Sequence, residues 1–144
     1  MDNESKSAVR LLETLQSAER ILSRLANNFR LKGANARSFL SLSGTPFTVH
    51  RDGLARVYRG SALLVISVDG PVVKGIELYV DILWDDSQWT IMTEAWMDDP
   101  VNDGQIFLRA LPEIACDDLS TCLSTIPAAC ESLVGFEDLV FSMS

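Results

Sequence analysis

Histidine is almost absent from this chain of 144 residues, which carries a single copy, His50. Imidazole is the most common switchable acid or base near neutral pH, so a Ser-His or Cys-His catalytic pair depends on that one side chain. The motifs GxGxxG, GxxxxGK(S/T), GxSxG and HExxH are also missing. We therefore predict a non-enzymatic protein with no catalytic residues and no cofactor.

Cysteine is too scarce, and wrongly spaced, for a disulfide framework or a zinc site. The three cysteines are Cys116, Cys122 and Cys130, an odd number that suits reduced thiols. A zinc site takes CxxC spacing or a nearby histidine, but His50 lies 66 residues before Cys116. We expect these cysteines to be small buried side chains and expect no metal site.

Long hydrophobic runs are missing too. No stretch approaches the roughly 20 consecutive apolar residues that span a bilayer. The opening sequence MDNESKSAVR contains two acids before its first lysine and no early apolar run, unlike a secretory signal. These observations predict a cytoplasmic protein that does not bind membranes.

Basic residues are absent between Lys74 and Arg109, a stretch that carries eight acidic residues. Positions 1–74 hold 11 Lys or Arg and 6 Asp or Glu, a net charge of +5, whereas positions 75–144 hold 1 and 14, a net charge of −13. The total of −8 argues against a partner that is a nucleic acid. The acidic half is interpreted either as a solvated surface or as a surface that steers a basic partner.

Hydrophobic residues make up 47% of the chain, enough for one folded domain over 1–144. Apolar residues recur at steps of three and four from Leu11 to Phe29, which predicts a helix over 1–32 with Gly33 as its stop. Positions 33–46 are rich in small residues and are expected to form a connector. The sequence FTVHR-DG-LARVYR from 47 to 59 is typical of a hairpin.

The strongest strand signal comes from IELYVDILW at 76–84 and WTIMTEAWM at 89–97. Placing Trp84 opposite Trp89 pairs Ile82 with Ile91 and makes one face of the hairpin almost wholly apolar. The same register places Leu78 opposite Ala95 and Ile76 opposite Met97. A slip of one residue exchanges the two faces, so the pattern itself predicts the register.

The whole pattern predicts an α+β fold with a long N-terminal helix, an antiparallel meander of about five to six strands and a C-terminal helix. The helices are expected to pack on one face of the sheet. Pro112 is expected to open the C-terminal helix, and Pro127 to kink or split it. The predicted segments are a helix at 1–32, a connector at 33–46, an antiparallel sheet at 47–110, a helix at 112–134 and a tail at 135–144.

The second face of the 76–84 and 89–97 pair carries the candidate site. It combines carboxylates with large side chains, a mixture typical of binding surfaces. The alternative interpretation is that the connector 33–46 or the tail covers this face, which makes Trp96 a core residue. The predicted partner-binding residues are Glu77, Tyr79, Asp81, Met92, Glu94 and Trp96.

We therefore expect a small acidic module that holds a basic or amphipathic protein partner. In size, charge and class it is comparable to toxin-neutralising immunity proteins and to secretion chaperones, although the extra helix usual in such chaperones is not predicted. One alternative is a ligand-binding or hydrolytic domain with a pocket between sheet and helix, in which Glu77 or Glu94 acts as acid or base. The residues lining that pocket are expected to be Tyr79, Trp84, Trp89 and Trp96. Another alternative is a homodimer formed through an edge strand or the N-terminal helix.

Overall fold

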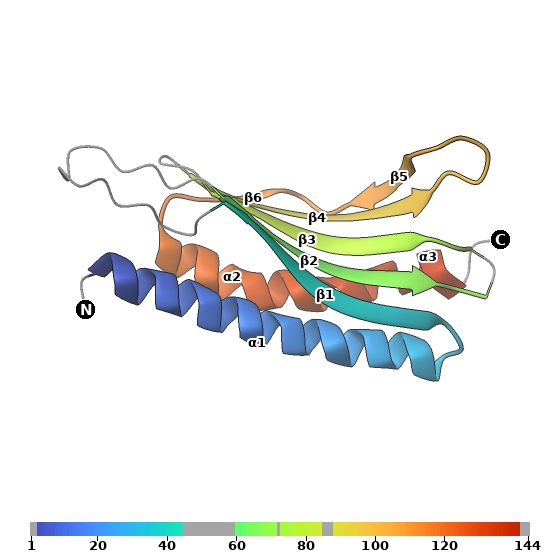
Figure 1. Cartoon of the computed structure of the whole chain (residues 1–144), viewed down its shortest axis with the longest axis horizontal. Coiled ribbons are helices and arrows are strands. Elements are labelled where there is room, and N and C mark those ends of the chain that lie inside the picture. Colours follow the sequence, from blue (N-terminus) through green and yellow to red (C-terminus); the bar gives the residue numbers. More distant parts are fainter. Residues whose placement is uncertain (1–2, 45–59, 72, 85–87, 142–144) are drawn as a thin grey trace.

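A computed structural model describes residues 3–44, 60–71, 73–84 and 88–141 of the chain. A twisted antiparallel sheet forms one layer, and the helices lie together against one of its faces (Figure 1). This arrangement confirms the predicted α+β class and the predicted order of a helix, a sheet and a C-terminal helix. The predicted hairpin at 47–59, together with His50, lies outside the described residues.

The long helix α1, Asn3–Leu31, forms because its apolar side chains fall on one stripe. Leu11, Leu15 and Leu22 on this stripe are completely buried against the sheet. Gly33 ends the helix at a φ of 100°, a conformation that costs other residues more than glycine. The Ala34 N–H donates to the Phe29 carbonyl and closes the turn.

Five strands follow one another across the sheet in chain order, and a short sixth strand pairs with β4 beside β5. The β3–β4 register matches the prediction at every pair, from Trp84 opposite Trp89 to Ile76 opposite Met97. The strands are β1 Asn35–Gly44, β2 Gly60–Asp69, β3 Ile76–Trp84, β4 Trp89–Asp98, β5 Gln105–Ala110 and β6 Ile114–Cys116.

The predicted connector at 33–46 is wrong, because Asn35–Gly44 form β1 and pair with β2 over all ten residues. From Leu40 to Ser43, leucine alternates with serine in the two-residue period of a strand. The small side chains obscured that period because serine favours turns. The loop expected within the domain is therefore an edge strand of the sheet.

The C-terminal helix starts later than predicted. Residues Ile114–Cys116 form β6, and the first helical residue of α2, Leu119–Glu131, follows Asp118. The Asp118 carboxylate accepts from the Thr121 N–H at 2.8 Å and caps the helix. Pro127 lies inside α2 without splitting it, so of the two expected effects, a kink or a split, the split is wrong. A 3₁₀ turn η1, Ser132–Phe136, and a short helix α3, Glu137–Phe141, occupy most of the predicted tail.

The C-terminal segment packs beneath the sheet rather than over its other face. The ring of Phe141 stacks on Phe29 of α1 with centroids 5.9 Å apart. Leu119–Phe141 is long and apolar enough, by length and composition alone, to cross a membrane. Ile126, Leu133 and Phe136 of this segment are nevertheless buried in the same hydrophobic core as α1 and the sheet.

All three cysteines are free and buried, as predicted from their number. Burial raises the pKa of Cys122 and Cys130 to about 12, so these thiols are protonated and unreactive near neutral pH. They serve as small core side chains.

Candidate functional site

The candidate site is the face of the sheet that points away from the helices, which we call the open face. The β3–β4 register and the alternation of side chains along each strand assign residues to this face. Its described members across β1 to β5 include Arg37, Phe39, Ser41, Leu63, Val65, Ser67, Asp69, Glu77, Tyr79, Asp81, Leu83, Thr90, Met92, Glu94, Trp96 and Phe107.

All six side chains predicted to bind a partner lie on the open face. None of them is fully buried and none is fully exposed, because each packs against its neighbours on adjacent strands. The register places Glu77 opposite Trp96, Tyr79 opposite Glu94 and Asp81 opposite Met92. The structure thus brings the six residues together over the two central strands.

The interpretation that another segment covers this face is wrong for the described part of the chain. The segment expected to cover it, 33–46, contributes β1 at the edge of the sheet. The described tail lies on the helix side, where α3 contacts η1 and Phe141 contacts Phe29. Figure 1 shows α1, α2 and α3 on the same side of the strands.

Glu94 is the centre of a hydrogen-bonded group on the open face. Its Oε2 atom accepts from the Trp96 indole N–H at 2.8 Å and from the Tyr79 hydroxyl at 3.1 Å. Burial, followed by the bond to Glu94, raises the pKa of Tyr79, so its hydroxyl keeps the proton that it donates. Two rigid aromatic donors therefore hold one carboxylate in a defined position.

A second carboxylate, Asp81, lies diagonally across from Glu94. Partial burial, and then repulsion by the Glu94 charge, raises the pKa of Asp81. A positive charge that binds near Asp81 and Glu94 offsets the repulsion between the two carboxylates. The open face is therefore electrostatically suited to a cation.

Aromatic and aliphatic side chains extend the open face beyond the residues predicted from the sequence. Phe107 of β5 packs edge-on against Trp96 with ring centroids 5.3 Å apart, and half of its surface is exposed. Phe39 of β1 is 40% exposed, and Leu83 of β3 is 37% exposed. Phe107 was missed because a β-bulge between Ala95 and Trp96 shifts the β4–β5 register, and no residue pattern announces that bulge.

Charges on this face are strongly unequal. Glu77, Asp81 and Glu94 lie on its central strands, and Arg37 on β1 is the one basic residue among its described members. Asp98 ends β4, and the acidic residues Asp99 and Asp103 follow in the turn before β5.

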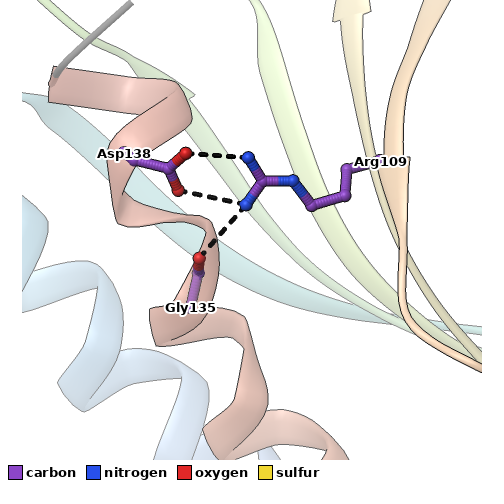
Figure 2. Close-up of polar contacts among 3 residues, drawn as sticks. All are labelled: Arg109, Gly135 and Asp138. Atoms are coloured by element: carbon purple, nitrogen blue, oxygen red, sulfur yellow. Dashed lines mark hydrogen bonds and ion pairs between the residues drawn. The ribbon is translucent and has the colours of Figure 1, made fainter.

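The single basic residue of the acidic half is engaged on the opposite side of the sheet. Arg109 of β5 makes a two-pronged ion pair with Asp138 of α3, at 2.7 and 3.1 Å, and reaches the Gly135 carbonyl (Figure 2). Its guanidinium also lies 5.7 Å from the centre of the Phe136 ring. Arg109 therefore ties the C-terminal helices to the sheet and does not neutralise the open face.

The pocket predicted between sheet and helix, lined by four aromatic residues, is wrong in its geometry. Trp84 and Trp89 are buried on the helix side, where their rings lie 5.3 Å apart, whereas Tyr79 and Trp96 lie on the open face. Residues on opposite faces of a sheet cannot line the same cavity. A surface hollow of about 460 Å³ lies instead beside α1, between Leu25 and Glu131, away from these carboxylates.

No group of three or more metal-ligating side chains occurs within the described ranges. Comparison of the chain with protein-family models, with curated proteins and with solved structures finds no match.

Proposed function

We propose that this chain is a non-enzymatic protein-binding module whose open face holds a basic or amphipathic protein partner. The observation that carries this proposal is the Glu94 carboxylate, held by Tyr79 and Trp96 on a sheet face that no described helix covers. A carboxylate fixed in advance loses little side-chain freedom when a ligand binds, which favours affinity.

The chemistry of the face favours a partner segment with Lys or Arg side chains. A guanidinium placed on Glu94 contacts the Trp96 ring as well, and so combines an ion pair with a cation–π contact. The flanking Phe107 and Leu83 offer exposed apolar area to neighbouring side chains of the same partner. The acidic residues around them discourage acidic competitors and speed the approach of basic ones.

Within this class we favour an inhibitor of immunity type, because a half-chain with a net charge of −13 complements the basic active site of a nuclease. A secretion-chaperone role is the other member of the class. We place the protein in the cytoplasm, where buried thiols such as Cys122 and Cys130 remain reduced.

The proposal is tested by charge reversal with a matched control. Asp81→Lys with Glu94→Lys is expected to abolish capture of basic host proteins in a cross-linking pull-down followed by mass spectrometry. Glu13→Lys with Glu131→Lys makes the same charge change at exposed positions of α1 and α2, on the helix side of the sheet, and is expected to keep capture. Capture by the wild-type chain is expected to weaken with added salt.

Two outcomes contradict the proposal. Equal loss of capture in both double variants means that net charge alone attracts the partners, and it contradicts a defined site. Capture that survives Asp81→Lys with Glu94→Lys, in a chain with an unchanged circular dichroism spectrum, excludes the open face as the binding surface.

A further inference from the structure

Strand β1 forms an open edge of the sheet. It pairs with β2 on one side, and no described strand follows it on the other. At the start of this edge, the Ala34 N–H donates to the Phe29 carbonyl and the Ala36 carbonyl accepts from the Arg30 guanidinium. Since backbone groups alternate in direction along a strand, the even-numbered residues of β1 carry the outward groups.

Helix α1 therefore closes this edge only at its beginning. Beyond Ala36, the outward backbone groups of Ser38, Leu40 and Leu42 form no backbone hydrogen bond within the described ranges. A row of unpaired N–H and C=O groups is a template for one more strand.

The edge also lacks the features that usually prevent pairing. Residues 38–44 contain no charge and no proline, and the β1–β2 register has no bulge. Leu42 is 45% exposed and Phe39 is 40% exposed. The opposite edge differs, since β5 is only six residues long and joins β4 through a bulge.

A second apolar contribution comes from α1 along the same edge. Ser23 of α1 contacts Ser38 of β1 through their hydroxyls at 3.1 Å, so this flank of the helix faces β1. Leu12 precedes Ser23 by 11 residues, close to three whole turns, and so lies on the same flank. Its side chain is 39% exposed.

The chemistry of this edge fits a second copy of the chain better than the basic partner of the open face. The carboxylates of the candidate site begin on β3, two strands away, roughly 10 Å at the spacing of paired strands. A neutral run of serine and leucine is complementary to itself when two copies run antiparallel. Arg37, the one charged residue of β1, then lies at opposite ends of the two strands.

We infer that β1 pairs antiparallel with β1 of a second copy, which joins two sheets into one across a two-fold axis. On the helix side of the joined sheet, Leu40 and Leu42 of one copy then lie opposite Leu40 and Leu42 of the other copy. Both open faces point to the same side of the joined sheet, so the dimer presents two binding surfaces together. This inference does not depend on the proposed function of those surfaces.

The test measures the mass of the full chain in solution by light scattering over a dilution series. The wild-type chain is expected to run as a dimer that dissociates on dilution. Leu42→Lys places like charges near one another at the junction and is expected to raise the dimer dissociation constant about tenfold or more. Val101→Lys makes the same change at an exposed turn position and is expected to leave the dissociation constant unchanged.

Hydrogen exchange distinguishes this junction from other dimers. The amides of Leu40 and Leu42 are expected to be protected at high concentration and to exchange quickly on dilution, whatever the folding yield of Leu42→Lys. A monomer at the highest concentration reached overturns the inference. So does a dimer in which these two amides exchange quickly, because such a dimer uses another surface.

Discussion

The side chain of Glu94 organises its surroundings, because two aromatic donors converge on one of its oxygens. Tyr79→Phe removes one donor and keeps the ring. We expect the free energy of unfolding to fall by about 1 kcal/mol, the usual size for one partly exposed hydrogen bond. Urea unfolding followed by tryptophan fluorescence measures this change. An unchanged midpoint shows that the hydroxyl contributes nothing to the folded state.

Asp81 opposes folding at neutral pH. Because burial and repulsion by Glu94 raise its pKa in the folded chain, the folded state binds the proton more tightly than the unfolded chain does. The resulting penalty is present above the raised pKa, where both states are ionised. It disappears as the pH falls through that value and below about 3.9, the usual pKa of aspartate.

Asp81→Asn is therefore expected to stabilise the protein at pH 7, by an amount that shrinks towards pH 4. Urea unfolding at several pH values measures the difference from wild type. Asp117→Asn, at an exposed position, is the control and is expected to change stability little at either pH. A gain for Asp81→Asn that grows on acidification contradicts the assignment.

The positions of the six residues of the candidate site were predictable, because strand alternation alone decides which face of the sheet each side chain lies on. Once Trp84 is placed opposite Trp89, the direction of Glu94 and Trp96 follows from the period of two. The bond geometry around Glu94 was not predictable, since it depends on side-chain torsions that the residue pattern does not encode. Phe107 depends on a bulge and was likewise hidden.

Among the elements, the end of α1 depends on one glycine. Gly33 has a φ of 100°, and a Cβ built there meets no atom within 4 Å, so the cost of a substitution comes from the backbone alone. Gly33→Ala is expected to lower the free energy of unfolding by about 1 kcal/mol, and Gly33→Asn by less. Thermal unfolding of the two variants checks this order. Equal stability of Gly33→Ala and wild type contradicts it.

Elements with a strong local signal were predicted well, and elements defined by distant partners were not. The helix at 1–32 and the paired strands carry clear periods of 3.6 and 2. In contrast, β6 exists because β4 continues past the end of β5 and leaves backbone groups to be paired with Ile114–Cys116. This pairing is visible only in the folded structure, so the sequence pattern placed the start of the helix at Pro112 instead.

For the whole molecule, the main feature is the separation of roles between the two faces of one sheet. The helix side buries the apolar residues, the cysteines and Trp84 with Trp89. The other side collects the carboxylates with Tyr79 and Trp96. A net charge of −13 on the second half of the chain is thus combined with an uncovered aromatic surface.

The three tryptophans allow the most direct test of this account, because their indole N–H signals are resolved by proton–nitrogen NMR. A peptide rich in arginine and leucine serves as the probe, and an acidic peptide of equal length is the control. We predict that the basic peptide shifts the Trp96 signal in a manner that saturates and weakens with salt, while the signals of the buried Trp84 and Trp89 stay in place. A Trp96 signal that does not move, or equal shifts of all three indoles, contradicts the claim that the open face is the binding surface.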